Sequence, residues 1–356
     1  MRITVDLTPL LIRSAGVKGY LYYWYRALRA LPDADVHGFP FLDSPGELRH
    51  ESSTEGFAAT VRGIAWLHLV RKLPSLTPAC DVFHASNQVY AGPRSARLTT
   101  TLHDVTSWLT PETHTAANRA ADARYLTRIL KRADGIIAVS ENTRRDAIEV
   151  LRLDPSRIFT IHSGVAEAFF TASPEEARRK YKLDRPYVLF VGAIEPRKNL
   201  DRLLDAWREL TRDVELVIVG ASGWAPPETV RRLSETPGVR RLGYVPEADL
   251  PGITSGALAL AYPSLYEGFG FPVVQAMAAG APVLTSNTSC LPEVAADAAV
   301  LVDPRDTEAI RDGLRRLLDD PTLRATLAQA GGLRAGHFRW DRCARESMDF
   351  FKQLSR

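Results

Sequence analysis

Acidic and glycine residues lie next to one another in the segment Tyr262–Gly280. Glu267 comes directly before Gly268 and Gly270, and Pro272 follows them. Glycines allow the backbone to turn and expose its N–H groups, and proline favours the first turn of a helix. Such a loop can bind a diphosphate, and the carboxylate of Glu267 can accept hydrogen bonds from sugar hydroxyls. Taken alone, the segment also fits a strand, a turn and a helix with a solvated glutamate.

Two basic residues, Arg197 and Lys198, follow a predicted strand in the segment Val191–Leu200. Asn199 comes next, at the position of a side chain that caps the following helix. Cations at the start of a helix oppose its dipole, so a bound anion would offset their unfavourable position. The segment alone also fits a solvated basic turn.

Short apolar runs alternate with helical patterns along the chain, which is typical of parallel sheets wrapped by helices. The predicted strands are Ile3–Asp6, Asp35–Phe39, Val82–His84, Leu98–Leu102, Gly135–Val139, Ile158–Ile161, Tyr187–Val191, Val214–Val219, Ala257–Ala261, Pro282–Thr285 and Ala299–Val302. The predicted helices of the first half are Tyr20–Leu31, Phe57–Lys72, Glu112–Arg132 and Glu141–Leu151. We therefore expect an α/β fold with two Rossmann-like, doubly wound domains that bind ligands in a cleft between them.

The polar stretch 171–186 predicts the boundary between these domains, because it combines a helix-start signal with a turn. We expect a first domain in residues 1–172 and a second in residues 173–336. Residues 337–356 are expected to form a C-terminal helix that crosses back to the first domain.

Composition excludes several classes of protein. The 356 residues are 45% hydrophobic and 24% charged, as in globular proteins of two domains. A net charge of +3 is far below that of a nucleic-acid binder. The 3 cysteines lack the spacing of a zinc module or a disulfide framework, which fits a reducing compartment. Because the sequence shows no secretory signal and no apolar stretch of about 20 residues, we expect a cytoplasmic protein.

Together these motifs resemble those of the retaining glycosyltransferases of the GT-B fold, in the family 4 group, and most of all its bacterial mannosyltransferase-type members. The resemblance covers nearly the whole chain. The segments that match the family pattern are Gly16–Gly19, His103–Asp104, Ser140–Thr143, His162–Val165, Pro196–Asn199, Pro263–Gly280 and Ser286–Val294.

The resemblance implies roles for individual residues. Arg197 and Lys198 would hold the diphosphate of a nucleotide-sugar donor, and Glu267 would bind hydroxyls of the transferred sugar. His103 would reach that sugar from the first domain, unless it is a structural histidine at the end of a strand. Further residues implied in the donor cleft are Gly16, Gly19, Ser140, Gly192, Tyr244, Val245, Gly268, Phe269, Gly270 and Gln275. Within this set, the base would lie near Tyr244 and Val245 and the ribose near Gln275.

The implied reaction moves a hexose from a nucleoside diphosphate sugar to a hydroxyl of a glycan or lipid-linked saccharide, with retention of configuration. Arg197, Lys198 and the helix near Pro272 would stabilise the leaving group in place of a metal ion, so no cofactor is expected. The Pro-Arg-Lys-Asn loop favours GDP-mannose as the donor, while UDP- and dTDP-sugars stay open. The sequence determines neither the acceptor, nor the linkage, nor the oligomeric state.

Two positions depart from the family pattern. Gln275 stands where the family has its second glutamate, and Ala193 stands where many relatives have an arginine. A carboxylate binds ribose hydroxyls more strongly than an amide does, so these changes would weaken donor binding. Two alternative functions are a non-catalytic nucleotide-sugar-binding scaffold of a glycan-assembly complex and a sugar-nucleotide epimerase of the same fold.

Two other patterns admit a structural explanation. The aromatic run Tyr20–Tyr25, with the nearby cations Lys18 and Arg26, fits peripheral contact with a membrane that holds a lipid-linked acceptor. More often such a run is a buried helix with tyrosine hydroxyls at its rim. Asp33 and Asp35 match the Asp-x-Asp metal pattern of the other major glycosyltransferase fold, but their place between a helix and a strand predicts a turn.

Overall fold

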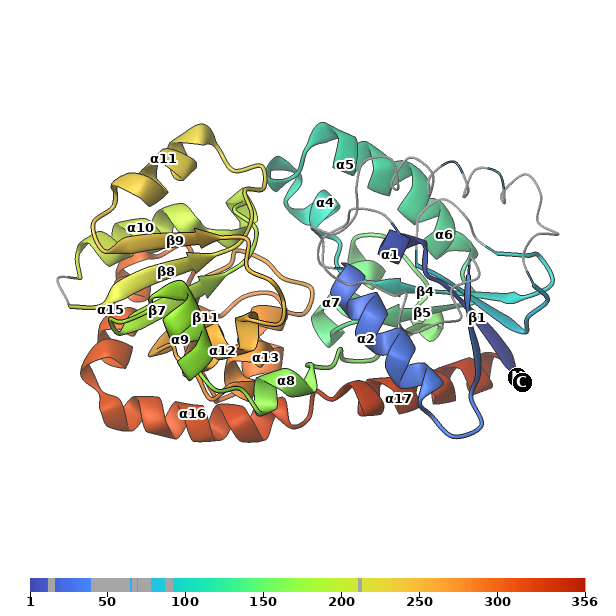
Figure 1. Ribbon diagram of the computed structural model, residues 1–356. Coiled ribbons are helices and arrows are strands. Elements are labelled where there is room, and N and C mark those ends of the chain that lie inside the picture. The colour runs from blue at the N-terminus through green and yellow to red at the C-terminus, as the bar shows by residue number, and fades with distance from the viewer. Residues whose placement is uncertain are drawn as a thin grey trace. The chain divides into compact units, whose positions relative to one another are not determined.

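The computed structural model describes residues 1–11, 17–39, 65, 69, 78–86, 92–210 and 213–355. The chain divides into two compact units (Figure 1). Unit 1 comprises Met1–Gly164 and Arg339–Arg356, and unit 2 comprises Val165–Phe338. The sequence placed the boundary at residues 172 and 173, whereas α8, which comes before that point, belongs to unit 2.

A six-stranded parallel sheet forms the centre of unit 1, in the order β2-β1-β3-β4-β5-β6. Its strands are β1 Arg2–Asp6, β2 Asp35–Phe39, β3 Val82–Ala85, β4 Arg97–Leu102, β5 Gly135–Ala138 and β6 Ile158–Thr160. Its α-helices are α1 Thr8–Leu11, α2 Val17–Arg29, α4 Thr106–Leu109, α5 Ala116–Ala121, α6 Thr127–Arg132, α7 Glu141–Glu149 and α17 Trp340–Leu354. Short turns of other helix types are η3 Pro111–Thr113, η4 Asp122–Leu126 and η5 Pro155–Arg157.

Unit 2 has a second six-stranded parallel sheet, in the order β12-β11-β10-β7-β8-β9. Its strands are β7 Tyr187–Val191, β8 Glu215–Val219, β9 Val239–Gly243, β10 Ala259–Tyr262, β11 Val283–Ser286 and β12 Val300–Val302. Its helices are α8 Glu167–Phe170, α9 Glu175–Tyr181, η6 Pro196–Lys198, α10 Leu200–Arg208, α11 Pro227–Glu235, α12 Leu250–Ser255, α13 Phe271–Ala278, α14 Leu291–Ala295, α15 Thr307–Asp319 and α16 Pro321–Ala335. The predicted α/β fold with two doubly wound sheets is confirmed.

Burial explains why most strands could be predicted. The first four residues of β7 are 0% exposed, and all four residues of β10 are also 0% exposed, as expected for parallel strands covered on both faces. The edge strand β9 was not predicted, because Arg240 and Arg241 give it no apolar pattern.

One predicted helix is interrupted. The sequence predicted a single helix over Glu112–Arg132, but the structure has the 3-10 turn η3, the helix α5, the π-type turn η4 and the helix α6. Short 3-10 and π-type turns differ from an α-helix only in the spacing of their backbone hydrogen bonds, which the side-chain pattern of the sequence did not reveal. Of the predicted helix Phe57–Lys72, all but Ala65 and Leu69 lies outside the described residues.

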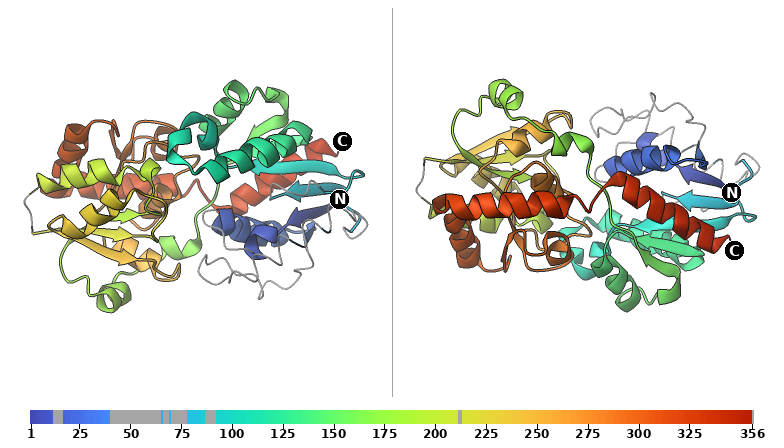
Figure 2. Two further views of the ribbon diagram at one scale, coloured as in Figure 1. Left: turned by 90° about the horizontal axis from the view of Figure 1, so that it is seen from above. Right: turned by 90° about the horizontal axis from the view of Figure 1, so that it is seen from below.

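The last helix of the chain, α17, packs on α2 in unit 1 (Figure 2). The indole Nε1 of Trp24 donates to Ser347 Oγ at 3.0 Å, and the ring of Trp24 lies 6.3 Å from that of Phe351. Trp24 and Tyr25 are 0% exposed and Lys18 is 1% exposed. This burial favours the interpretation of the aromatic run as a buried helix, and nothing in the described residues supports membrane contact.

Candidate active site

The order of strands in unit 2 creates a place for a ligand. The chain passes from β7 to β8 and β9 on one side, and from β10 to β11 and β12 on the other. The two central strands, β7 and β10, pair in parallel, with Val188 opposite Ala259 and Leu189 opposite Leu260. Open α/β sheets bind ligands where the strand order reverses, beyond the carboxyl ends of the strands. The loops that follow β7 and β10 carry the two motifs singled out in the sequence.

Asn199 joins these two loops. It directly precedes α10, as predicted, but its side chain makes no capping hydrogen bond. Instead the amide Nδ2 donates to the carbonyl oxygen of Pro263 at 2.9 Å and to that of Pro304 at 2.6 Å. The predicted N-cap position is confirmed, but the side chain does not cap α10. Asn199, in a left-handed conformation with φ 61°, supplies hydrogen-bond donors to two buried carbonyls instead.

The loop after β10 has the predicted strand–loop–helix form. Helix α13 begins at Phe271 with Pro272 in its first turn and ends at Ala278, shortly before Gly280. Gly270 has φ 82°, and a Cβ atom there would lie 2.7 Å from Leu291 Cδ2. The positive φ therefore favours glycine here, and a Cβ atom would also force the end of the Leu291 side chain to move.

Four charged side chains meet where the two loops approach each other. Arg197 Nη1 lies 2.8 Å from Glu267 Oε2, and Lys198 Nζ lies 2.7 Å from Glu267 Oε1. Arg197 Nη2 also lies 2.7 Å from Glu195 Oε1. Glu195 and Glu267 are 5% and 7% exposed. The interpretations of a solvated glutamate and a solvated basic turn are both wrong, since these charges are buried against one another.

The two oxygens of Glu267 are held differently. Oε1 accepts hydrogen bonds from Lys198 Nζ, from the Tyr262 hydroxyl at 2.9 Å and from the Ser264 hydroxyl at 2.6 Å. Oε2 faces Arg197. A carboxylate oxygen has two lone pairs, so Oε2 keeps the capacity to accept a further bond from a ligand hydroxyl.

Electrostatics keep this cluster charged at neutral pH. Burial alone would raise the pKa of Glu267, but the charges of Arg197 and Lys198, with hydrogen bonds from Lys198 and Ser264, outweigh it and lower the pKa to about 2. Burial lowers the pKa of Lys198, and Glu267 and Glu195 oppose that effect. With two cations and two anions, the cluster is neutral overall, and its ion pairs hold these side chains in place.

Sequence reasoning missed three residues of this cluster. Glu195, Tyr262 and Ser264 lie inside the two motifs, but nothing in the sequence shows which of their side chains point toward Lys198 and Glu267. The signal that could have identified Glu195 is its place two residues before Arg197, since a buried guanidinium needs a carboxylate partner.

Comparisons with known proteins now identify the family. Residues 15–169 match the model described as "Glycosyltransferase Family 4", and residues 173–334 match "Glycosyl transferases group 1". The O-antigen chain mannosyltransferase B of Escherichia coli is 31% identical over 385 aligned positions, which cover 99% of this chain and 100% of that protein. This chain belongs to the group 1 and family 4 glycosyltransferases.

Solved structures agree on the fold of this glycosyltransferase. Sucrose-phosphate synthase from Thermosynechococcus elongatus superposes with a TM-score of 0.78 at 20% identity, covering 99% of each chain. The Anabaena protein HepE in complex with UDP-glucose gives a TM-score of 0.75 at 17% identity, covering 99% of this chain and 100% of that one. At such low identities the likeness shows the fold alone, which is GT-B.

Three more residues predicted to contact the donor, Gly192, Gly268 and Phe269, lie in the loops that follow β7 and β10. A Cβ atom at Gly192 would lie 3.5 Å from Lys198 Cε, so this glycine is close to the cluster. Phe269 is 4% exposed and packs against Phe271 and Phe338, which gives it a place in the core. Gly268 is also buried.

Three predicted contacts lie on other elements of the same unit. Gln275 is half-buried in α13. After β9, Tyr244 is 40% exposed and Val245 is 7% exposed, so an aromatic face remains accessible at the carboxyl end of that strand. An exposed tyrosine ring at this edge can stack on a nucleobase.

Unit 1 holds the other predicted residues. His103 follows β4 and is half-buried, with the ring of Tyr20 edge-on at 4.8 Å. Burial lowers the pKa of His103 to about 4, so its imidazole is neutral at neutral pH. Ser140 caps α7 by accepting from the Thr143 amide at 3.0 Å. Gly19 lies in α2, and Gly16 lies outside the described residues.

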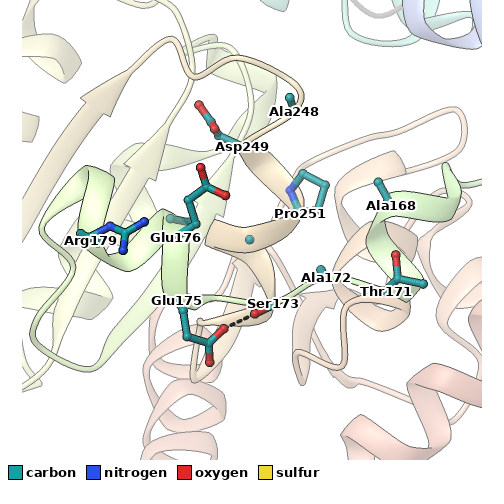
Figure 3. Close-up of a pocket in the computed structure, with 12 residues that line it drawn as sticks. Ala168, Thr171, Ala172, Ser173, Glu175, Glu176, Arg179, Ala248, Asp249 and Pro251 are labelled. Atoms are coloured by element: carbon teal, nitrogen blue, oxygen red, sulfur yellow. Dashed lines mark hydrogen bonds between the residues drawn. The ribbon is translucent and has the colours of Figure 1, made fainter.

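A separate cavity of about 460 Å³ opens in unit 2 (Figure 3). Its walls come from α8, α9 and the start of α12, and its charged side chains are Glu175, Glu176, Arg179 and Asp249. Asp249 already accepts hydrogen bonds from Lys180 and Tyr181, and none of the predicted donor contacts lines this cavity. The chemistry of the enzyme is therefore expected elsewhere, at the cluster.

In the part of the chain that the structure describes, no helix is both long and apolar enough to span a membrane. In the same ranges, no group of three or more His, Cys, Asp or Glu side chains is arranged to hold a metal ion. Asp33 lies in the predicted turn, with φ 58°, and Asp35 pairs with His37 and Arg2.

Proposed function

We propose that this glycosyltransferase moves a hexose, with mannose favoured, from a nucleoside diphosphate sugar to a glycan or lipid-linked saccharide. The observation that supports this most is the cluster of Arg197, Lys198 and Glu267 at the strand-order reversal of unit 2. It offers cations for a diphosphate and a carboxylate for sugar hydroxyls within one buried site. The likeness to an O-antigen chain mannosyltransferase over the whole chain supports the choice of mannose and of a saccharide acceptor.

In the proposed reaction, the bond between the sugar C1 and the diphosphate oxygen breaks and a bond from C1 to the acceptor oxygen forms. Arg197 and Lys198 would stabilise the negative charge that develops on the leaving diphosphate, in place of a metal ion. The start of α13, with its N–H groups after Gly270, would add to this stabilisation. The proton of the acceptor hydroxyl would pass to a phosphate oxygen of the donor, and configuration at C1 would be retained.

Glu267 would position the transferred sugar through Oε2, the oxygen that faces Arg197. Gln275 would accept from the ribose more weakly than the family's glutamate. Tyr244 would stack on the base and Val245 would lie beside it. His103, kept neutral by burial, would accept or donate one hydrogen bond to the sugar.

GDP-mannose is the favoured donor, and UDP- and dTDP-sugars are the alternatives. Thermal unfolding with GDP, UDP, dTDP or ADP, with and without EDTA, distinguishes them. A nucleotide at about 100 times its Kd stabilises the unit that binds it by about 2.7 kcal/mol, which raises the midpoint by several degrees. We expect a shift with one nucleotide that is insensitive to EDTA, absent in Lys198→Gln and retained in the surface control Lys180→Gln.

Other outcomes would contradict parts of this proposal. Equal shifts in both lysine variants would place the nucleotide away from the cluster. A shift that EDTA abolishes would show that a metal ion takes part in binding. Binding without any sugar transfer to a saccharide acceptor would favour the non-catalytic scaffold.

A further inference from the structure

The hydroxyl of Tyr262 lies between the two oppositely charged side chains of the cluster. It accepts a hydrogen bond from Lys198 Nζ at 2.5 Å and donates to Glu267 Oε1 at 2.9 Å. We propose that Tyr262 is a positioning residue, whose hydroxyl orients the Lys198 ammonium toward the donor diphosphate. This inference rests on the proposed function, because Lys198 and Glu267 are donor contacts only in that proposal.

Tyr262 is placed by the centre of the sheet, whereas the groups that it contacts lie outside the sheet. It is the last residue of β10, which pairs with β7 on one side and β11 on the other. Its side chain is 0% exposed, and its ring lies 6.0 Å from that of Phe190. Lys198, by contrast, ends the short 3-10 turn η6, Glu267 lies in the loop after β10, and both have long side chains with several rotatable bonds. A phenol fixed by a central strand thus limits the directions available to both.

The Tyr262 hydroxyl both donates and accepts a hydrogen bond within the cluster. The phenol has one proton, and donating it to Glu267 turns its lone pairs toward Lys198. The ammonium has three N–H donors, of which Tyr262 and Glu267 accept two. The third donor is available for a phosphate oxygen of the nucleotide sugar.

The hydroxyl also favours the charged form of Lys198. Three charged groups face this ammonium: Glu267, which lies after β10, and Arg197 and Glu195, which lie after β7. Burial lowers the pKa of Lys198, whereas the charges of Glu267 and Glu195 and the hydrogen bond to Glu267 raise it. By the same physical effect, the Tyr262 oxygen that accepts a hydrogen bond from the ammonium favours its charged form. Burial and the nearby Glu267 raise the pKa of Tyr262 well above its usual value, so the phenol keeps its proton.

The variant Tyr262→Phe removes the hydroxyl and keeps the ring. Tyr187→Phe is the matched control, because Tyr187 is equally buried in the adjacent strand β7 and its hydroxyl donates to the Ile253 carbonyl at 2.5 Å, outside the cluster. The pKa of Lys198 can be measured by NMR titration of ¹³C-labelled lysine, since the chain has only seven lysines and Lys198→Arg assigns the signal. The same variants are then assayed for donor KM and kcat as a function of pH.

We expect the pKa of Lys198 to fall by about one unit in Tyr262→Phe, as for the loss of a hydrogen bond to a charged group. The control should leave it unchanged. The alkaline limb of activity should move to lower pH by the same amount, with kcat/KM about tenfold lower above that limb.

An unchanged Lys198 pKa in Tyr262→Phe would overturn the inference whether or not the enzyme turns over. A lowered pKa with unchanged donor KM and kcat would instead remove Lys198 from the donor site, which is a failure of the proposed function. If Tyr262→Phe does not fold, the wild-type enzyme still provides the test. Its Tyr262 hydroxyl proton should exchange slowly with water and show a cross-peak to the Lys198 side chain, and rapid exchange would contradict the inference.

Discussion

Replacing Glu267 by glutamine should destabilise unit 2 strongly, although the two side chains have the same shape. Glu267 is 7% exposed and its carboxylate contacts Arg197, Lys198, Tyr262 and Ser264. The variant would leave two buried cations with Glu195 as their carboxylate in the cluster. Removing one partner of a buried ion pair costs about 3–5 kcal/mol, because the remaining charge stays buried.

The pKa of Glu267 gives a second route to the same magnitude. A carboxyl group shifted from its usual 4.5 to about 2 on folding stabilises the folded state by about 3 kcal/mol at neutral pH. Since the folded pKa is the lower one, this contribution is present above about pH 4.5 and is lost as the pH falls through about 2. The difference between the wild type and Glu267→Gln should therefore shrink across this range.

Urea unfolding at pH 7, followed by circular dichroism and tryptophan fluorescence, measures the effect. Glu228→Gln is the matched control, since Glu228 pairs with Arg231 on the surface of α11, where a lost ion pair has little effect on stability. A loss in Glu267→Gln below about 1 kcal/mol, or one equal to that of the control, would refute the argument that burial makes this pair costly to break.

Three further predictions concern both units. Asn199→Ala should destabilise unit 2 by about 2–4 kcal/mol in urea unfolding, because two buried carbonyls lose their donor; a loss below about 1 kcal/mol would contradict this role. His84 and His103 have folded pKa values of about 3 and about 4, so unit 1 should lose stability as the pH falls from about 6.5 toward 4, and a constant urea midpoint over that range would contradict it. Gly270→Ala should reduce stability and nucleotide affinity more than Gly280→Ala does, since both glycines have positive φ but only Gly270 meets a neighbouring side chain. Equal effects would show that backbone strain alone accounts for both losses.

The strands of this enzyme were the easiest part to predict. Parallel strands buried on both faces, such as β7 and β10, must be almost wholly apolar, and a run of that kind is visible in any sequence. The edge strand β9 does not meet this criterion. Its backbone pairs with β8, but Arg240 and Arg241 give it no apolar run. Strand prediction therefore followed burial, and was weakest where burial ends.

The site was predictable in its members but not in its contacts. The motifs identified Arg197, Lys198 and Glu267 as site residues. They predicted, however, that a bound ligand anion would offset the charges of the two cations. In the structure these cations pair with Glu195, which lies two residues before Arg197, and with Glu267, which lies 69 residues after Lys198. Local sequence does not reveal the contact with Glu267, because it joins two separate loops. The side-chain contacts of Asn199 could not be predicted for a similar reason, since the carbonyls that accept its hydrogen bonds belong to distant segments.

Transfer of sugar from a nucleotide donor is the most direct test of the cluster as a donor site. The measurement is the release of nucleoside diphosphate from GDP-mannose, UDP-sugars and dTDP-sugars, with lipid-linked and free saccharides supplied as acceptors. We expect release from one class of donor, with saccharide product formed in equal amount. The rate should be at least about 100-fold lower in Lys198→Gln and unchanged in Lys180→Gln. Release from no donor, or equal rates in the two lysine variants, would contradict a donor site at the cluster.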